Sequence, residues 1–328
     1  APAESAASSA PDGSLEVHFL DIGQGDSALL FCGEETMLID GGKVKNNQKL
    51  IARLKELEVD HLDAVICSHP DEDHCGGLSA VLASTRTDAF YCSVDSWHTK
   101  VFSDVTKYVE QQGISVTVPQ AGDTFAFSDA SVEFLGPVVD YGDDPNEGSL
   151  VARVRYGETS FLFTGDMGFE AEDDMLAAGV DVSATVLKVA HHGSAGSSST
   201  EFLQAVHPQY AVISVGADND YGHPTEAALN RLAACGIPVY RTDLLGEIIA
   251  VSDGKTVTIT SASNEAPPAS DAASQTAGSY GYVGNSSSKV VHLASCGKLP
   301  GESNRVYFAS LDEALAAGYR KHANCLGN

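Results

Sequence analysis

The stretch HPDEDH, from His69 to His74, is the most informative part of this sequence. It follows directly on a short apolar run, 64–67, which predicts a buried strand. Four side chains of metal-ligating type fall within these six residues. A loop that leaves a strand can turn alternate side chains toward one point, and imidazole with carboxylate suits zinc, manganese or iron. A lone histidine at a strand end is usually structural, but so dense a group favours a metal site over a solvated loop.

Two further ligand candidates stand after other predicted strands. Asp166 follows the strand 160–163, and His191 follows the strand 185–189 and begins the stretch HHGS. Taken singly, Asp166 could be the N-cap of a helix over 169–178, and the paired histidines could be core or surface residues. Because all three candidate groups follow a strand, we expect them to meet at one edge of the fold, as a metal site requires.

The patterns on both sides of these motifs predict a mixed fold. Residues 15–40 contain short strands separated by glycine-rich turns, and the apolar spacing over 47–57 predicts a helix. Strands are also expected at 131–135, 150–156, 160–163, 185–189, 210–215, 239–240, 246–251 and 256–260, and helices at 77–84, 169–178, 199–206 and 225–235. Strands and helices interspersed without strict alternation indicate the α+β class, with two sheets faced by helices.

Composition divides the chain into four parts. Residues 1–14 are small and polar and are expected to form a disordered leader, such as would remain after removal of a secretory signal. Residues 15–262 carry the motifs and form the main domain. Residues 263–279 are rich in Pro, Ala and Ser without periodicity, which is typical of a linker, and 280–328 form a small separate module.

The charge of the chain is strongly unbalanced. It has 19 Lys and Arg against 45 Asp and Glu in 328 residues, a formal net charge of −26. The C-terminal module carries +2, so the rest carries −28. Such a surface disfavours anionic membranes and broad non-specific binding of nucleic acid. No apolar run of about 18 residues predicts a membrane span, and the leader favours an exported protein, extracellular or at the cell surface.

Several motifs of the main domain resemble, in order, those of the metallo-β-lactamase superfamily. HPDEDH is similar to the HxHxDH signature of that superfamily, with Asp71 in place of its second histidine; the other similar motifs are DGG (40–42), FTGD (163–166) and HHGS (191–194). Within the superfamily the chain looks like the hydrolase domain of the ComEC type of DNA-uptake competence protein. That likeness rests on FLDIGQGDS (19–27), SHPD (68–71), ISVG (213–216) and YGHP (221–224), and it extends over residues 15–260.

This resemblance implies a four-layer αββα sandwich with two divalent metal ions, Zn or Mn, at one edge. The residues it implies as ligands come from three motifs: His69 and Asp71 for the first ion, Asp73, His74 and His191 for the second, and Asp166 bridging both. Many relatives carry a further histidine before the bridging aspartate, whereas the corresponding stretch here, 146–149, has none. Water or substrate would then complete the ligands of the first ion.

Four side chains are expected to act in catalysis or substrate binding. Asp73 would orient the attacking water as well as bind metal. His223, on the loop after the strand 210–215, could donate to a substrate oxygen or protonate a leaving alkoxide, or be an ordinary loop histidine. His192 and Ser194 would steady His191 or contact the substrate.

The C-terminal module resembles the small metal-binding module of the DNA-repair protein Ada. The similar stretches are YVGN (282–285), residues 289–296, NRVYF (304–308) and ALAAGYR (314–320). The Ada pattern has four cysteines, whereas only Cys296 and Cys325 stand here, so a disulfide and a metal site assisted by His292 are both left open. The positive charge of the module predicts a tethered contact with nucleic acid; the alternative is a structural or wall-attachment module.

The sequence therefore predicts a metal-dependent hydrolase. A phosphodiesterase or nuclease acting on DNA is the first hypothesis, because of the ComEC-type motifs and the basic module. The second is hydrolysis of another ester, such as a phosphocholine ester, a lactone or a β-lactam, since the same metals would serve each. A binding protein with a degenerate site is the third, and the nearly complete ligand set argues against it.

Overall fold

The computed structural model describes residues 13–217, 219–262, 282–293, 299–301, 304–308, 311–322 and 325. The expected linker, and all but the last two residues of the expected leader, lie outside these ranges. Cys296 does as well, so its pairing with Cys325 lies outside the described residues.

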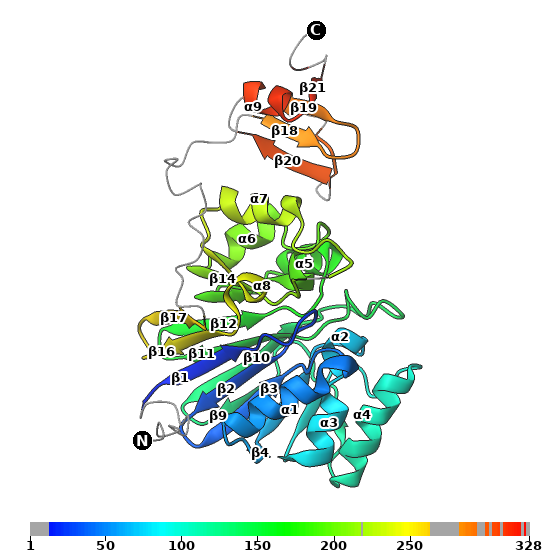
Figure 1. Cartoon of the computed structure of the whole chain (residues 1–328), viewed down its shortest axis with the longest axis vertical. Helices are drawn as coiled ribbons and strands as arrows, with labels where there is room; N and C mark the ends of the chain where they lie inside the picture. Colours follow the sequence, from blue (N-terminus) through cyan, green and yellow to red (C-terminus); the bar gives the residue numbers. More distant parts are fainter. Residues whose placement is uncertain are drawn as a thin grey trace.

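The first half of the sandwich is a sheet covered on its outer face by helices (Figure 1). Its strands run in the order β17-β16-β1-β2-β3-β5-β7-β8. Their bounds are β1 Leu15–Phe19, β2 Ala28–Cys32, β3 Glu35–Ile39, β5 Ala64–Cys67, β7 Phe90–Cys92, β8 Val116–Thr117, β16 Ile248–Ser252 and β17 Val257–Ser261. The covering helices are α1 (Asn47–Glu56), α3 (Leu78–Ser84) and α4 (Lys100–Gln111), and their apolar faces share one core with the sheet.

The second half repeats this arrangement. Its strands run in the order β15-β14-β13-β12-β11-β10-β9. Their bounds are β9 Thr124–Phe127, β10 Ala130–Gly136, β11 Val151–Tyr156, β12 Thr159–Phe163, β13 Val186–Lys188, β14 Tyr210–Ile213 and β15 Val239–Arg241. The outer helices are α5 (Phe169–Ala177), α6 (Thr200–Val206) and α7 (Glu226–Ala234). Shorter elements join these: η1 Val44–Asn46, β4 His61–Leu62, α2 Glu72–Cys75, β6 Arg86–Thr87, η2 Ala190–Gly193 and α8 Thr242–Leu245.

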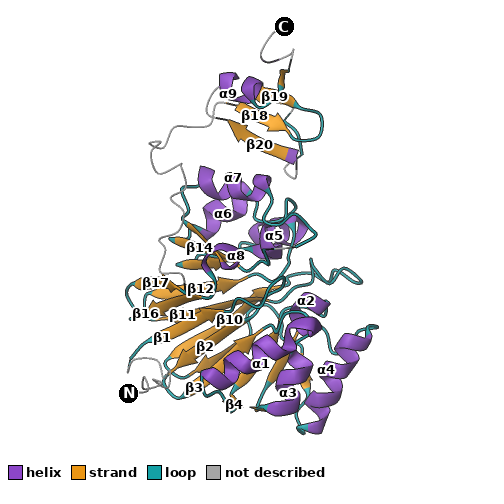
Figure 2. Cartoon of the chain, in the orientation of Figure 1, coloured by secondary structure: helices purple, strands orange, loops and turns teal. Residues whose placement is uncertain are grey.

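The two sheets face each other across the central core, with the helices outside (Figure 2). In β2, Leu30 packs into the core between the sheets, while its neighbours Leu29 and Phe31 pack toward the helices. A strand buried on both faces must be apolar throughout, which explains the continuous run ALLFC. The predicted four-layer αββα architecture is confirmed.

Residues 86–127, for which the sequence analysis predicted no element, contain β6 to β9 and α4. α4 buries Phe102, Val105 and Val109 on one face, and the side chain of Thr99 caps it by accepting a hydrogen bond from the Phe102 amide. Its valines favour strands over helices. The helix therefore depends on burial of one face rather than on local propensity.

A buried network ties β1 to its neighbours. His18 is 2% exposed, with Nδ1 2.6 Å from Glu247 Oε1 and Nε2 2.6 Å from Glu16 Oε1. Arg53 Nε donates to Glu247 Oε2 at 2.7 Å. Burial alone would lower the pKa of His18, but the two carboxylates outweigh it and raise that pKa above 6.5. Protonated His18 therefore stabilises the folded chain.

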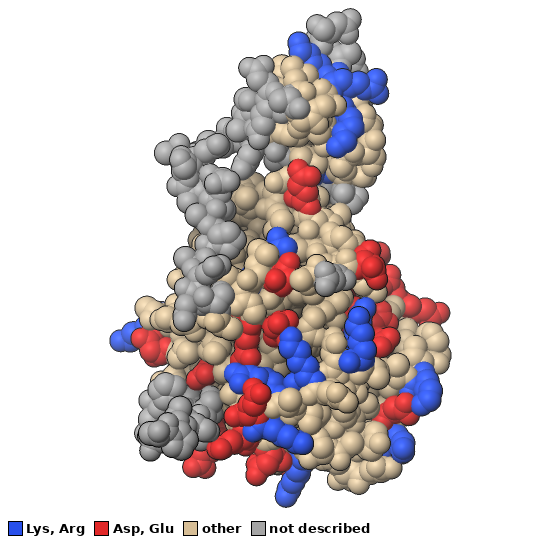
Figure 3. Space-filling model, in the orientation of Figure 1, with Lys and Arg blue, Asp and Glu red and all other residues tan. Residues whose placement is uncertain are grey.

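The C-terminal module has its own sheet, in the order β20-β18-β19-β21. Its elements are β18 Tyr282–Asn285, β19 Val290–Leu293, β20 Arg305–Phe308, α9 Leu311–Ala316 and β21 Arg320–Lys321. β20 lies next to α7 of the main domain. On the face shown in Figure 3, acidic and basic side chains mix over the main domain, and basic side chains are visible on the module.

Candidate metal centre

The carboxyl ends of parallel strands from both sheets meet at one edge. β3 and β5 are parallel neighbours in the first sheet, and β12, β13 and β14 are parallel neighbours in the second. The loops after β5, β12 and β13 carry the predicted ligands. HPDEDH continues into the short helix α2, which begins at Glu72. Ligand sites of sheets with parallel strands form at this end.

Three buried histidines direct their Nε2 atoms to this edge. His69, His74 and His192 are at most 1% exposed, and none of these Nε2 atoms has a hydrogen-bond partner among the described residues. Asp166 Oδ1 is likewise buried without a hydrogen bond, 3.0 Å from His74 Nε2. His192 Nε2 lies 3.5 Å from Asp166 Oδ2 and 3.8 Å from Asp73 Oδ2. Because buried polar atoms are nearly always satisfied, these converging donor atoms fit a divalent metal ion.

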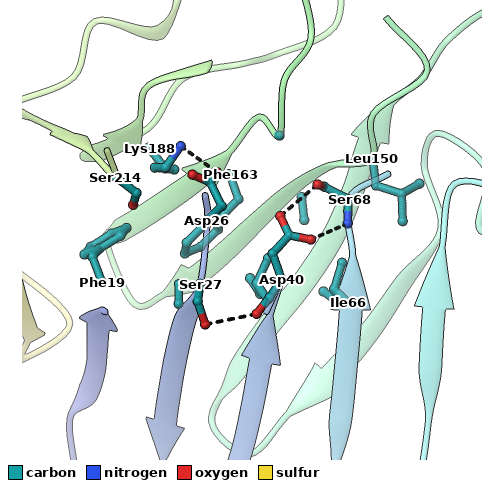
Figure 4. A pocket seen from close by; sticks show the side chains of 14 residues that line it. Phe19, Asp26, Ser27, Asp40, Ile66, Ser68, Leu150, Phe163, Lys188 and Ser214 are labelled. Atoms are coloured by element: carbon teal, nitrogen blue, oxygen red, sulfur yellow. Dashed lines mark hydrogen bonds and ion pairs between the residues drawn. The ribbon is translucent and has the colours of Figure 1, made fainter. Parts of the chain in front are cut away.

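The Nδ1 atoms of these histidines contact groups that fix the orientation of the rings. His74 Nδ1 lies 2.8 Å from Asp40 Oδ2, and Ser68 donates to Asp40 through both its amide and its hydroxyl at 2.7 Å. Figure 4 shows the two contacts between Ser68 and Asp40, at the ends of β5 and β3. Metal-binding histidines are usually oriented in this way.

Ser149 ends the stretch 146–149, which has no histidine. It is fully buried, and its Oγ lies 3.3 Å from His69 Nδ1. The same hydroxyl accepts a hydrogen bond from the Asp166 amide at 3.1 Å. A small hydroxyl residue thus positions two candidate ligands at this place instead of binding metal through an imidazole.

A buried ion pair supports His192. Asp26 Oδ2 lies 2.6 Å from Lys188 Nζ, and these side chains are 8% and 4% exposed (Figure 4). Asp26 Oδ1 lies 3.1 Å from His192 Nδ1, which also contacts the Ser214 carbonyl at 2.9 Å. Burial raises the pKa of Asp26, but the positive charges of Lys188 and His192 outweigh it and hold that pKa far below its usual range. Because Lys188 engages one oxygen of Asp26, we assign this carboxylate to positioning rather than to metal ligation.

The loop after β13 has a left-handed backbone. His191, His192 and Gly193 have φ of 50°, 53° and 81°, a region that is costly for a histidine. A Cβ on Gly193 would lie 2.6 Å from Pro224 Cβ, so the position requires glycine. In this conformation His192 is buried, whereas the His191 side chain stays 31% exposed, with its Nε2 3.6 Å from Asp166 Oδ2. Both histidines therefore reach the predicted bridging aspartate.

Asp71 and Asp73 lie on the solvent side of the group. Asp71 Oδ2 is 4.0 Å from His69 Nε2, and the Asp71 side chain is 40% exposed. Burial and the neighbouring Asp73 carboxylate raise the pKa of Asp71. Crowded carboxylates behave in this way without a cation, and a bound cation would relieve the repulsion.

Lys43, Tyr221 and His223 line the solvent side next to Asp73. Lys43 Nζ lies 3.9 Å from Asp73 Oδ2 and donates to the Tyr221 hydroxyl at 3.2 Å. The ring of His223 stacks on Tyr221 at 5.8 Å between centroids and meets His191 edge-on at 5.5 Å. Burial and the neighbouring histidines lower the pKa of His223 to about 4. His223 is therefore neutral near pH 7, and the N–H of its neutral ring is its hydrogen-bond donor.

Of the six predicted ligands, His74 and Asp166 offer ligand atoms within 4.8 Å of one another, together with Asp26 and His192. His191 lies 3.6 Å from Asp166, Asp73 lies 3.8 Å from His192, and Asp71 lies 4.0 Å from His69, whose ring packs on that of His74. His192, which was predicted to steady His191 or to contact the substrate, is thus itself among the candidate ligand atoms. The hydrogen bonds of Ser194 to described residues stay within its own loop and on Arg231. Its amide donates to the His191 carbonyl at 2.9 Å, its Oγ accepts from the Gly196 amide at 3.3 Å, and its carbonyl accepts from Arg231 Nη2 at 3.5 Å. The sequence analysis assigned no role to the residues that position the candidate ligands, which are Asp26, Asp40, Ser68, Ser149 and Lys188. For Lys188 the sequence does offer an indication, because a lysine inside the apolar strand VLKVA needs a buried partner.

A four-layer αββα fold with imidazoles and carboxylates gathered at its strand ends defines a class of metallohydrolases. The model of the metallo-β-lactamase superfamily matches residues 20–217, well over half of the chain. The chain belongs to this superfamily, as a hydrolase with a candidate metal site.

Its curated relatives are bacterial. The chain is 31% identical over 251 residues to ComE operon protein 3 of Bacillus subtilis, covering 71% of this chain and 32% of that protein. It is 34% identical over 240 residues to the competence protein ComA of Neisseria gonorrhoeae, covering 73% and 32%. It is 30% identical over 241 residues to recombination protein 2 of Haemophilus influenzae, covering 71% and 28%. These relatives support a ComEC-type domain, and the chain spans about a third of their length.

The helices within the described ranges are all too short or too polar to cross a membrane.

Proposed function

We propose that this chain is a phosphodiesterase that cleaves DNA with two divalent ions, zinc or manganese. The observation that carries the proposal is the convergence of buried ligand atoms without hydrogen bonds among the described residues, beside the cation Lys43, which lies 3.9 Å from Asp73 on the solvent side. His69 and Asp71 would hold one ion, Asp73 and His74 the other, and Asp166 both. Of the two adjacent histidines, burial favours His192 as the remaining ligand, while His191 is the one that the family resemblance implied.

The residues at the solvent side fit the hydrolysis of a phosphodiester. Two divalent ions in such a site supply an activated water and neutralise charge on a phosphoryl oxygen. Asp73 accepts a hydrogen bond from the attacking water and so orients it. Lys43 offers a positive charge to a non-bridging oxygen of the substrate, and the Tyr221 hydroxyl beside it offers a hydrogen bond. His223 offers a hydrogen bond from its neutral ring N–H to the leaving oxygen, and water would supply the proton that completes the alcohol.

Two observations support DNA as the substrate. One of the relatives is named a competence protein and another a recombination protein, and both processes concern DNA. In addition, the main domain is acidic and repels phosphates at a distance, with a screening length of about 8 Å at physiological salt. A basic module tethered to it would raise the local concentration of nucleic acid.

The test is metal analysis of the purified full chain with cleavage assays on DNA, RNA, bis-p-nitrophenyl phosphate and nitrocefin side by side. We expect metal-dependent cleavage of DNA and of the small diester. Asp73→Ala should abolish it with the fold intact, whereas Asp95→Ala, on an exposed loop, should change nothing. Cleavage of nitrocefin alone, or undiminished diester turnover by folded Asp73→Ala, contradicts the proposal.

The two adjacent histidines form a matched pair for a second experiment. If His192 is the ligand, His192→Ala should lose one ion per chain, whereas His191→Ala should keep both ions. The reverse pattern would assign the ligand to His191.

A further inference from the structure

The C-terminal module contains a second group of metal-ligating side chains. His292 on β19, His322 directly after β21, and Cys325 each offer one ligand atom, and these atoms lie within 4.8 Å of one another. The rings of His292 and His322 stack with centroids 4.0 Å apart. Cys325 Sγ lies 3.2 Å from His322 Nδ1. Two imidazoles and a thiol are a donor set that zinc favours.

His292 supplies an independent observation that points to a ligand. Its side chain is 7% exposed, and its Nδ1 atom is buried with no hydrogen-bond partner among the described residues. A buried ring nitrogen is normally satisfied by a donor, an acceptor or a metal. The ligand-type groups beside the His292 ring are the His322 imidazole and the Cys325 thiol.

The size of the module gives a physical reason for an ion. Among the described residues, its buried apolar cluster is small: Val291, Val306, Phe308, Ala314 and Tyr319. Domains below about 70 residues rarely gain enough stability from such a core and rely on metals or disulfides. β19 and β21 pair in parallel at the edge of the sheet, and β21 has only two residues. An ion held by His292 on β19 and by His322 directly after β21 would fasten this edge.

We propose that His292, His322 and Cys325 bind one zinc-like divalent ion, separate from the main centre, which stabilises the fold of the module. A fourth protein side chain would complete the ligand set. The ion then has a structural role and does no chemistry on the substrate, because a structural zinc site is closed by its protein ligands.

Cobalt substitution of the full chain distinguishes this site from the main centre. The candidate ligands of the main centre are histidines and aspartates, so a thiolate-to-cobalt charge-transfer absorption reports only on a cysteine site. We expect this absorption in the cobalt-loaded chain. In Cys325→Ser the absorption should disappear, and the chain should bind one ion fewer. Cys235→Ser is the matched control, because Cys235 is a half-buried free cysteine outside the cluster, and it should retain the absorption.

Three results would overturn the proposal. The first is the absence of the thiolate absorption while the main centre binds cobalt. The second is its persistence in Cys325→Ser. The third is a disulfide that consumes the Cys325 thiol, detected by thiol titration of the unfolded, unreduced chain. Should His292→Ala fail to fold, His292→Cys keeps a ligand at this position and should bind the ion with a stronger thiolate absorption; loss of the ion in that folded variant also contradicts the proposal.

Discussion

Asp26→Asn should lower the free energy of unfolding by about 3–5 kcal/mol, because it leaves Lys188 as a buried ammonium without a counter-charge. The two groups are 2.6 Å apart, and their side chains are 8% and 4% exposed, so water cannot replace the lost carboxylate. Asparagine keeps the size and one oxygen of the side chain, which limits any loss of packing. His192 also loses its anionic support, and metal affinity should fall by about 10–100-fold.

Urea unfolding of the metal-free protein measures the first effect without a contribution from bound metal. The matched control is Asp21→Asn: Asp21 lies 2.9 Å from Lys49, but the side chains are 37% and 56% exposed. An exposed pair contributes under about 1 kcal/mol, so this variant should unfold almost like the wild type. Adding Lys188→Met to Asp26→Asn should recover most of the loss. Equal destabilisation by the two aspartate variants, or no recovery in the double variant, would refute the reasoning.

Raising the pH from 6.5 upward should destabilise the main domain, because the folded chain raises the pKa of His18 and thus favours its protonated form; urea midpoints measure this, and a His18→Gln variant with the same pH slope would contradict it. Gly193→Ala should destabilise the chain by about 1–3 kcal/mol and abolish hydrolysis, because of its left-handed backbone and because its Cβ would lie 2.6 Å from that of Pro224. Gly196→Ala, with no atom closer than 4.0 Å to the new Cβ, should unfold and react like the wild type. A chain ending at Asn264 should hydrolyse a small diester at the full rate but bind long DNA more weakly at low salt; equal affinity would exclude nucleic acid as the partner of the module.

Much of the fold was predictable because its strands are apolar runs bounded by glycine or acidic residues. β12 and β13 were placed to within two residues, and their ends located Asp166 and His191. α4 was not predicted, since its valines carry a strand signal that only the packing of Phe102 and its neighbours against the sheet overrides.

The candidate site was predictable as a set of ligand-type residues but not as a geometry. Asp26 and Lys188 are far apart in the sequence, and nothing local to either residue indicates that they pair. His191 and His192 follow the same strand, so spacing cannot distinguish their roles. The left-handed backbone makes the difference, because it buries one ring and exposes the other.

The origin of the ligands in both sheets has a consequence for folding. His69 and His74 come from the N-terminal half of the sandwich, whereas Asp166 and His192 come from the other half. Neither half holds all of the candidate ligands, so tight binding of the proposed ions would require the two halves to be docked. A nascent chain would complete the centre only after its later half has emerged and folded. The ions would then stabilise the contact between the two halves. Amide exchange should slow in the facing strands, while the outer helices remain nearly unaffected.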